Sequence, residues 1–476
     1  METVQPVTPA RPKSAHLKSA RRQSPPSLRD TLLAVGLLGC AMAPLASAQA
    51  ETRTGYAVIE VDSGKVLLAR DVRAPYIPAS VAKLPAALVI LDRLPAETRF
   101  TTRLLSSGSI DKKGVLQGDL VLVGGGDPSL VHEDLQQMAK ALAQAGVKRV
   151  RGRFLYDGSA VPSLPAIEPR QPDDASYNPP LGGLAVDSSR FLVRWPKGKD
   201  GVTKAATGGE IPLAPAGLVD LPASFTSGDK WLPVKDPGLF AASVFAVYAR
   251  QEKITLPTPQ ATPQTAPAGS GATTTLASHT SEPLPTLLRD GLYYSNNMML
   301  ETLALQATAS ATPAEAGGKI NAAVQQMLPN VAWSKTSFVL HNASGLTDQS
   351  QMTPGQCAAL TAHAATAAFH GVAVKPLLRG RKLDPFMADD PGASPLLRTK
   401  TGTMFYARAL SGILTTASGK DLAFCIMSDD AEQRRLYDAL PFDSRDDARY
   451  RDPAKTWLKA AREQEEALVK EWYGKF

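Results

Sequence analysis

The apolar pattern of residues 56–94 predicts a β-hairpin followed by a buried helix. Two apolar runs between Tyr56 and Arg70 flank a polar turn, Asp62-Ser-Gly-Lys, which is an arrangement typical of a hairpin. The next apolar segment, residues 84–94, contains few polar residues and is longer than a usual strand. We therefore expect this segment to form a helix that is buried on most of its surface.

The pattern changes in the middle of the chain. From about residue 98 to 255, short β-like runs alternate with Gly and Pro turns, and one amphipathic helix is expected over residues 133–145. Residues 256–281 are rich in Pro, Thr, Ala, Ser and Gly and contain almost no large apolar residue. Such a composition predicts a loop or linker.

Regular patterns return in the last third of the chain. Helices are expected over residues 284–327 and 355–368, and two apolar strands are expected at 407–415 and 420–428. Cys357 falls in one of these helices and Cys425 in one of these strands. We expect two buried free thiols. The sequence leaves one alternative, a single disulfide between Cys357 and Cys425.

Residues 453–472 predict an amphipathic helix, with Asp452 as its N-cap and Pro453 as its first residue. Its large and small apolar side chains share one face: Trp457, Ala461, Leu468 and Trp472. Five basic and four acidic residues between 453 and 476 are too balanced to favour lipid headgroups. We expect the helix to dock on its own domain, and the sequence does not indicate the alternative, contact with a membrane surface.

The start of the chain resembles a targeting segment rather than part of a fold. Residues 1–30 are polar and basic, and the apolar stretch 31–48 ends in Ala46-Ser47-Ala48, the order of a secretory signal peptide cleaved after Ala48. Leu37-Leu38-Gly39-Cys40 also resembles a lipoprotein box, which would place a lipid on Cys40. We expect an exported, periplasmic protein, with a lipid anchor at Cys40 as the alternative.

Composition narrows the function classes. With 476 residues, 43% of them hydrophobic, the chain is long and apolar enough for one or more buried cores, which excludes a disordered or fibrous protein. The formal net charge is +7, but six basic and two acidic residues within 1–48 carry most of it. The remaining mild charge is compatible with an anionic cell-wall polymer, and no nucleic-acid partner is expected.

The first chemical motif is Ser80-Val-Ala-Lys83. A lysine three residues after a serine at a helix start lies on the same face, so its amine can reach the hydroxyl and act as a base. Ser109 with Lys112, and Ser227 with Lys230, repeat this spacing, but they lie among glycines in expected turns. Only Ser80 opens a buried apolar helix, which makes it the favoured nucleophile.

Two further motifs follow in order along the chain. Ser-x-Asn occurs as Ser176-Tyr-Asn178 in a Pro-rich loop and as Ser295-Asn296-Asn297 just before a helical pattern. Lys400-Thr401-Gly402-Thr403 immediately precedes the apolar strand at 407. The ordered set Ser-x-x-Lys, Ser-x-Asn, Lys-Thr-Gly is the signature of penicillin-recognising serine acyl-transfer enzymes.

Between Ser80 and Ser295 lie more than 200 residues, far more than a single-domain β-lactamase has. This insertion carries Gly124-Gly-Gly-Asp-Pro-Ser-Leu130 and Tyr177-Asn-Pro-Pro180, and over about residues 55–430 the chain resembles the class C low-molecular-mass penicillin-binding proteins, the D-alanyl-D-alanine carboxypeptidase/endopeptidases. His279-Thr-Ser-Glu-Pro-Leu284 and Ser344-Gly-Leu346 also fit. Asn342-Ala343 departs from the family, which has Asp-Gly there.

The resemblance implies a mixed α/β (α+β) fold with a penicillin-binding, β-lactamase-like transpeptidase domain, an antiparallel sheet flanked by helices. The catalytic domain is expected to be split into residues 49–97 and 281–476. Residues 98–280 would form a large, mainly β insertion that ends in the Pro/Thr/Ala-rich loop. Sequence alone assigns no role to the insertion.

The resemblance also implies site roles. Ser80 would be the nucleophile and Lys83 its base, while Ser295 and Lys400 would relay a proton to the leaving nitrogen. The remaining motif residues would bind substrate: Asn297, Thr401, Gly402 and Thr403. The backbone N–H groups of Ser80 and Thr403 would form the oxyanion hole. We further hypothesise that burial and the charge of Lys400 lower the pKa of Lys83 until its amine is neutral.

The expected substrates are peptidoglycan stem peptides and their cross-links, with β-lactams as covalent inhibitors. No cofactor is implied, and no metal, because His132-Glu133 is not completed to His-Glu-x-x-His. A serine β-lactamase-like hydrolase is one alternative, although no Glu-x-x-Leu-Asn lies between Ser80 and Lys400. A non-catalytic relative that binds peptidoglycan is the other, and the intact motifs argue against it.

Overall fold

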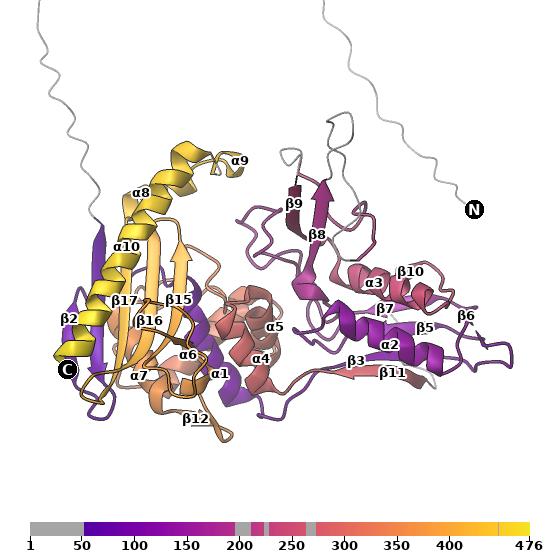
Figure 1. The fold of residues 1–476 in the computed structure, drawn as a ribbon, viewed down its shortest axis with the longest axis horizontal. Coiled ribbons are helices and arrows are strands. Elements are labelled where there is room, and N and C mark those ends of the chain that lie inside the picture. The colour runs from indigo at the N-terminus through magenta and orange to yellow at the C-terminus, as the bar shows by residue number, and fades with distance from the viewer. Residues whose placement is uncertain (1–51, 196–210, 223–227, 263–272, 446) are drawn as a thin grey trace, which may run out of the picture. The chain divides into compact units, whose positions relative to one another are not determined.

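The structure is a computed structural model that describes residues 52–195, 211–222, 228–262, 273–445 and 447–476 (Figure 1). The expected secretory segment 1–48, including Cys40, lies outside these residues. Within the described ranges, no helix has both the length and the apolar character needed to cross a membrane.

A six-stranded antiparallel sheet is built from segments at the two ends of the described chain (Figure 1). Its strand order is β14-β15-β16-β17-β1-β2, and β1 pairs with β17 so that Arg53 lies opposite Asp429. The predicted hairpin and the two predicted strands are confirmed as members of this sheet. Its strands are β1 (Arg53–Glu60), β2 (Val66–Arg70), β14 (Arg379–Arg381), β15 (Leu397–Met404), β16 (Ala407–Thr415) and β17 (Asp421–Asp429).

Helices cover this sheet and bury the largest apolar core. The predicted buried helix is α1 (Lys83–Arg93), in which residues 83–91 are all buried. It packs with four further helices, α4 (Leu284–Tyr293), α5 (Asn297–Thr308), α6 (Pro313–Met327) and α7 (Pro354–Thr366). Because α7 also contacts β1, β16 and β17, this core joins the helices to the sheet. The expected antiparallel sheet flanked by helices is confirmed.

A second sheet, of mixed direction, is formed within residues 101–280. Its order is β10-β7-β5-β3-β11, and β7 pairs in parallel with both β5 and β10. Parallel neighbours require crossover connections, and α2 (His132–Gln144) lies between β5 and β7 in the chain. The strands are β3 (Thr101–Ser106), β5 (Leu120–Val123), β7 (Phe154–Asp157), β10 (Pro259–Ala261) and β11 (Thr274–Thr280).

Three two-stranded ribbons complete the strands of the described residues: β4 (Val115–Leu116) with β6 (Arg149–Val150), β8 (Arg190–Trp195) with β9 (Gly228–Pro233), and β12 (Ala368–Phe369) with β13 (Val372–Ala373).

Two predictions for the middle of the chain were wrong. The expected loop 256–281 contains β10 and β11, because β11 pairs with β3 along the edge of the second sheet and buries Ala277. A helix not predicted, α3 (Pro237–Gln251), packs against α2. Asp236 caps α3 by accepting a hydrogen bond from Leu239 N, 3.0 Å away, and such a cap satisfies an otherwise unpaired backbone donor.

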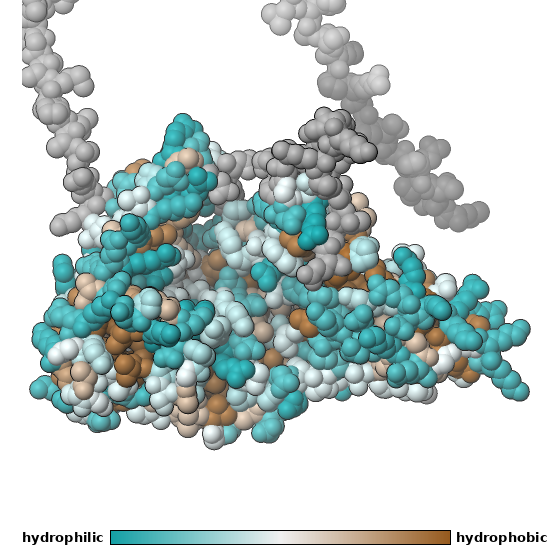
Figure 2. All heavy atoms as spheres, in the orientation of Figure 1, coloured by the Kyte–Doolittle hydropathy of each residue, from teal (hydrophilic) through white to brown (hydrophobic). Residues whose placement is uncertain are grey.

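The C-terminal helix α10 (Ala448–Lys475) docks on the first sheet as expected. Trp472 is buried among Val58, Phe424 and Ile426, and hydrophilic residues predominate over the outward side of α10 in Figure 2. The predicted start was wrong: Asp447, not Asp452, caps the helix, and Pro453 lies inside it. The Asp447 carboxylate accepts from Arg449 N and fixes the first turn upstream of the proline. Two short helices precede α10, α8 (Ala431–Asp438) and α9 (Phe442–Arg445).

The two cysteines form a disulfide, so the expectation of free thiols was wrong. Cys357 lies on α7 and Cys425 on β17, and their Cα atoms are 5.8 Å apart because α7 packs directly on that strand. The two residues are separated by 68 positions, and only the tertiary packing brings them within bonding distance.

Candidate active site

Ser80 lies on a short 3-10 turn, Ala79–Ala82, that leads directly into α1. Two other backbones press against this turn. A Cβ on Gly402 of β15 would lie 2.3 Å from Pro78 O and 3.1 Å from Ser80 N, and a Cβ on Gly345 would lie 1.8 Å from Ala79 O. Only glycine fits such contacts, so the Lys-Thr-Gly strand passes immediately beside the Ser80 backbone.

Two non-glycine residues in this region adopt left-handed backbone conformations. Ala79 has φ of 44° and precedes Ser80, and Ser295 has φ of 53°. A residue in this region of φ/ψ space costs about 1–3 kcal/mol, and such strain persists only where the surroundings fix the backbone. Both positions lie in or next to a predicted catalytic motif, where precise placement of a hydroxyl would justify the cost.

The amine of Lys83 connects three segments of the chain. Nζ lies 2.9 Å from Ser80 Oγ, 2.6 Å from Asn297 Oδ1 and 2.7 Å from the carbonyl oxygen of Ser344. The amide and carbonyl oxygens can only accept, so the amine donates to both. A neutral amine has two hydrogens, which these acceptors use, and its lone pair is then left to face the Ser80 hydroxyl.

The electrostatics agree with a neutral Lys83. Complete burial lowers the pKa of Lys83 from 10.5 to about 7, and the opposing influence is the carboxylate of Glu301, which raises it. The hypothesis that burial is a cause is therefore supported. The charge of Lys400 is not among the causes of the lowered Lys83 pKa, so that part of the hypothesis is not supported. Burial, then the charge of Lys83, lower the pKa of Lys400 well below its ordinary value.

Glu301 was not predicted from the sequence. It lies on α5, is completely buried, and accepts hydrogen bonds from Ser344 N at 2.7 Å and Ala343 N at 3.3 Å. It thus holds the turn whose Ser344 carbonyl binds Lys83. Asn342, which stands where the family has Asp, stabilises the same turn, because its Oδ1 accepts a hydrogen bond from Gly345 N at 2.8 Å.

Ser295 and Lys400 form a second close pair. Lys400 Nζ is buried and lies 2.9 Å from Ser295 Oγ and 2.8 Å from Thr401 O. The turn carrying Ser295 ends at α5, where Asn296 is the N-cap and accepts from Met299 N at 3.1 Å. This capping presents Ser295 before the helix and Asn297 at its first position.

Asn297 also connects the site to the inserted region. While its Oδ1 accepts from Lys83, its Nδ2 donates to Tyr177 O at 2.8 Å. The structure therefore brings together Ser80, Lys83, Ser295, Asn297 and Lys400, with Thr401, Gly402 and Thr403 on β15 beside them.

The competing motifs are placed elsewhere. The Asn178 side chain bonds to the backbone of Glu168, and Lys230 on β9 pairs with Asp174 at 2.6 Å. Ser227 lies outside the described residues.

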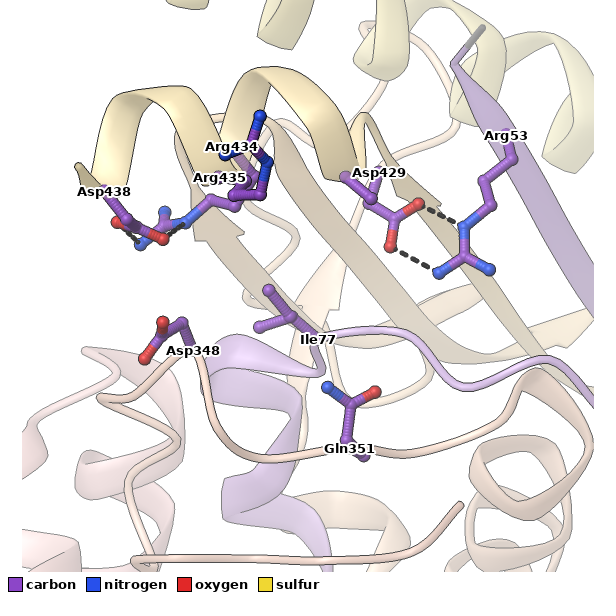
Figure 3. A pocket seen from close by; sticks show the side chains of 9 residues that line it. Arg53, Ile77, Asp348, Gln351, Asp429, Arg434, Arg435 and Asp438 are labelled. Atoms are coloured by element: carbon purple, nitrogen blue, oxygen red, sulfur yellow. Dashed lines mark hydrogen bonds and ion pairs between the residues drawn. The ribbon is translucent and has the colours of Figure 1, made fainter. Parts of the chain in front are cut away.

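A charged cavity of about 300 Å³ lies between the start of β1, helix α8 and the segment around Asp348 (Figure 3). Its wall includes Ile77, three residues before Ser80. Its guanidinium groups are paired: Arg53 Nε lies 2.6 Å from Asp429, and Arg434 Nε lies 2.6 Å from Asp438. Because the wall charges already neutralise one another, the cavity offers no single uncompensated charge to a ligand.

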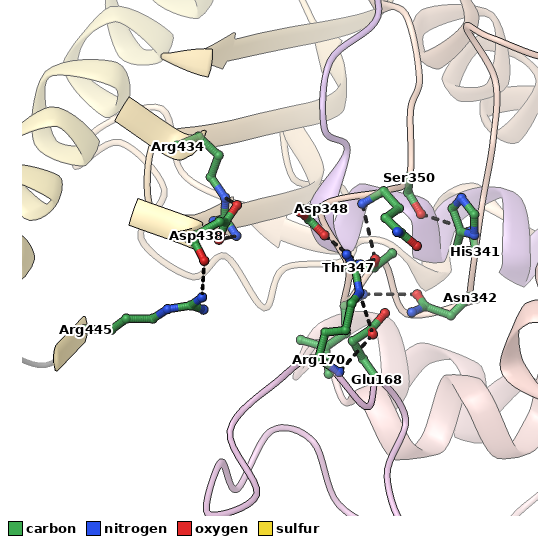
Figure 4. Close-up of polar contacts among 12 residues, drawn as sticks. Glu168, Arg170, His341, Asn342, Thr347, Asp348, Ser350, Arg434, Asp438 and Arg445 are labelled. Carbon is green, nitrogen blue, oxygen red and sulfur yellow. Dashed lines mark hydrogen bonds and ion pairs between the residues drawn. The ribbon is translucent and has the colours of Figure 1, made fainter. Parts of the chain in front are cut away.

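Arg170, from the inserted region, contacts the edge of this cavity (Figure 4). Its Nη2 donates to Thr347 Oγ1 at 2.9 Å and to Asp348 Oδ1 at 2.7 Å, and its Nε lies 3.2 Å from Glu168 Oε1. Arg170 therefore fastens the insertion to the segment that follows the Ser344 turn.

Comparison with known proteins places the chain in a family. The model of the D-Ala-D-Ala carboxypeptidase 3 (S13) family matches residues 43–213 and 219–441. The D-alanyl-D-alanine carboxypeptidase of an Actinomadura species is 27% identical over 424 residues, which are 79% of this chain and 77% of that protein. Carboxypeptidase DacB of Mycolicibacterium smegmatis is 26% identical over 437 residues, which are 85% of this chain and 83% of that one.

Solved structures show the same fold. Penicillin binding protein 4 (dacB) from Haemophilus influenzae superposes with a TM-score of 0.64 at 17% identity, over 80% of this chain and 90% of that one. The family model covers most of the chain, including all three motifs. The chain therefore belongs to the D-Ala-D-Ala carboxypeptidase 3 (S13) family, and it is a serine-type D-Ala-D-Ala carboxypeptidase.

Proposed function

We propose that Ser80 is the nucleophile with which this enzyme removes the terminal D-Ala from peptidoglycan stem peptides and cleaves D,D-cross-links between them. The observation that carries this proposal is the contact of the Lys83 amine with Ser80 Oγ at 2.9 Å, while both of its hydrogens are used by fixed acceptors. A neutral amine held in this way is a general base within reach of the hydroxyl proton.

In the first step, Lys83 accepts the Ser80 proton as Oγ bonds to the carbonyl carbon of the penultimate D-Ala. The oxyanion would be bound by the backbone N–H groups of Ser80 and Thr403. The approach of Gly402 to Ser80 N supports this role, because it puts the β15 backbone beside the turn that bears the nucleophile.

The second step breaks the peptide bond. Ser295 gives its proton to the nitrogen of the leaving D-Ala and recovers one from Lys400, which contacts Ser295 Oγ at 2.9 Å. Asn297 would form a hydrogen bond to the substrate amide, and Thr401 would bind the terminal carboxylate of the D-Ala. Water then attacks the carbonyl of the acyl-enzyme, and its proton passes through Ser295 back to Lys400. Lys83 returns to Ser80 Oγ the proton that it took in the first step, which restores the Ser80 hydroxyl and the neutral Lys83 amine.

The same chemistry applies to a cross-link, in which the leaving amine belongs to a second stem peptide instead of a free D-Ala. A β-lactam ring opened by Ser80 would give an acyl-enzyme of the same type, so β-lactams would be covalent inhibitors. These substrates lie outside the cytoplasm, which agrees with export through residues 1–48, either to the periplasm after cleavage at Ala48 or to a membrane through a lipid on Cys40.

We also propose a split catalytic domain, residues 49–97 plus 281–476, with residues 98–280 inserted. The distribution of strands supports this division, because the six-stranded sheet uses segments before residue 71 and after residue 378, and the five-stranded sheet uses only residues 101–280.

The test is to incubate the purified protein with muropeptide monomers and cross-linked dimers and to follow D-Ala release and cross-link loss by mass spectrometry. Wild type should produce both products, and Ser80→Ala should produce neither. Ser109→Ala is the matched control, because Ser109 begins a Ser-x-x-Lys sequence within the inserted residues, and this variant should retain full activity. Equal activity in wild type and Ser80→Ala would refute the proposal.

A further inference from the structure

A buried ion pair connects the C-terminal helix to the end of the Lys-Thr-Gly strand. Arg408, the second residue of β16, forms a two-point contact with Glu465 on α10: Nε lies 2.9 Å from Oε1 and Nη2 lies 2.9 Å from Oε2. The two side chains are 7% and 1% exposed. The third guanidinium nitrogen, Nη1, donates to Thr403 Oγ1 at 2.6 Å.

This last contact sets the direction of the Thr403 hydroxyl. A guanidinium has no acceptor, so Thr403 Oγ1 must accept the hydrogen from Arg408. The hydrogen of the threonine hydroxyl is then directed away from Arg408. Thr403 is exposed, so this hydrogen can be donated to a group that lies over β15.

The register of the sheet keeps the contact short. Thr403 lies directly opposite Arg408 in the antiparallel pairing of β15 with β16, and side chains of opposed residues lie on one face of a sheet. On that pair of strands, Arg408 can reach Thr403 and the covering helix α10 at the same time.

The helix that supplies Glu465 is firmly held. Trp472 packs on Phe424 with ring centroids 5.6 Å apart, and Gln464 accepts from the hydroxyl of Thr54 on β1 at 2.9 Å. Helix α10 follows residue 441, where the family match ends, so Glu465 lies beyond the matched residues.

Burying the pair has no evident advantage for stability. Taking two charges out of water costs several kcal/mol per ion, and well-packed apolar residues often replace a buried pair without loss of stability. The planar fork of arginine, in contrast, is suited to holding two partners in fixed directions. A gain in stability therefore does not by itself explain why these two charges are buried together.

We propose that Arg408 and Glu465 are positioning residues that orient the Thr403 hydroxyl toward the terminal carboxylate of the substrate, which makes the C-terminal helix part of the substrate-binding apparatus. This inference rests on the proposed function, because it takes the D-Ala carboxylate to be the group bound over β15. It predicts that loss of either residue weakens substrate binding more than it slows the chemical steps.

Four full-length variants test the inference. Glu465→Gln removes the charge that holds the guanidinium, and Arg408→Lys keeps a charge but loses the fork. Arg408→Met combined with Glu465→Leu removes the pair without leaving a buried unpaired charge, so it should fold. Gln464→Ala is the matched control, because it removes a hydrogen bond between the adjacent helix position and β1 but not the path to Thr403.

The measurement is kcat and KM for D-Ala release from a peptide ending in D-Ala-D-Ala, with circular dichroism to confirm folding. The loss of one oriented, charge-assisted contact should raise KM about tenfold in Glu465→Gln and in the double variant, with kcat within about twofold of wild type. Arg408→Lys should give an intermediate KM, and Gln464→Ala the wild-type value.

The outcomes distinguish failure of the positioning role of Arg408 and Glu465 from failure of the proposed function. If the folded double variant has the KM of wild type, the ion pair is only structural and the inference is wrong. A fall in kcat with unchanged KM would also overturn it. If wild type itself releases no D-Ala and forms no adduct with a labelled penicillin, the proposed function fails, and the inference fails with it.

Discussion

The pH dependence of acylation tests the assignment of Lys83 as the base. Burial lowers the pKa of Lys83 from 10.5 to about 7. At the ordinary value only about one amine in 3,000 would be neutral at pH 7, whereas at a pKa of about 7 half are neutral. The surroundings of Lys83 therefore increase the population of usable base more than a thousandfold.

The sign of the dependence follows from the role. A base must be neutral to accept the Ser80 proton, so acylation should rise as pH increases through the pKa of Lys83 and then level off. The neutral fraction is about one tenth at pH 6 and about nine tenths at pH 8, which predicts a roughly tenfold increase in rate. Stopped-flow acylation by a chromogenic or fluorescent penicillin between pH 5 and 9 measures it.

Glu301→Gln provides the matched perturbation. The carboxylate raises the pKa of Lys83, so its replacement by a neutral amide of the same shape should move the midpoint to lower pH. The plateau rate should also fall, because glutamine offers one acceptor oxygen to the two N–H groups that Glu301 now binds. The two effects are separable, since one changes the midpoint and the other the height.

Two results would refute this reasoning. A wild-type rate that does not change between pH 5 and 9 would mean that no group with a pKa near 7 is the base. A Glu301→Gln midpoint at higher pH would mean that the carboxylate does not act on Lys83 in the direction described. Lys400 also faces the site from β15, and burial and the charge of Lys83 hold its pKa well below the ordinary value. The Glu301→Gln shift assigns the pH dependence to Lys83, because Glu301 acts on the pKa of Lys83.

Three further predictions concern the relay and the stability of the fold. Ser295→Ala should lower the acylation rate by about 100-fold or more with little change in the thermal midpoint, because it removes a proton carrier and no packing; a rate near wild type would exclude the relay. Cys357→Ala with Cys425→Ala should lower the free energy of unfolding by about 4 kcal/mol, from the chain entropy of a 68-residue loop, and urea denaturation that gives wild-type stability would contradict it. Trp472→Ala should cost about 3–5 kcal/mol in the same assay, because the indole is 1% exposed, and a cost below about 1 kcal/mol would show that α10 adds little to the fold.

The elements that the sequence predicts well are those whose pattern is local. The apolar side chains of residues 84–94 avoid water only if most of the segment is buried, and the segment forms α1, which begins at Lys83. The three motifs likewise carry their own context of turn, helix and strand. They meet because α5 packs on α1, and β15 packs on the 3-10 turn that precedes α1.

The strands and side-chain contacts that could not be predicted from the sequence depend on pairing between residues far apart in the chain. β11 is rich in small and polar residues, and it is a strand because β3 offers it a partner. Cys357 meets Cys425, and Arg408 meets Glu465, only after a helix has docked on the sheet. A glutamate within a helix, such as Glu301, has the pattern of an exposed residue until the neighbouring turn covers it.

Asp447 illustrates a subtler limit. Asp452 followed by Pro453 has the sequence of a helix start, yet the helix begins earlier, at Ala448, because Asp447 caps it by accepting a hydrogen bond from Arg449 N. Both aspartates are good capping residues, so the sequence alone does not decide between two possible helix starts that lie within a few residues.

The most direct test of the central claim is the location of the covalent intermediate. The purified protein is incubated with a labelled penicillin, digested, and examined by peptide mass spectrometry, with Ser80→Ala and Ser109→Ala in parallel. The account predicts one adduct, on the peptide that contains Ser80, in wild type and Ser109→Ala, and none in Ser80→Ala. An adduct on a different residue, or a labelled Ser80→Ala protein, would contradict it.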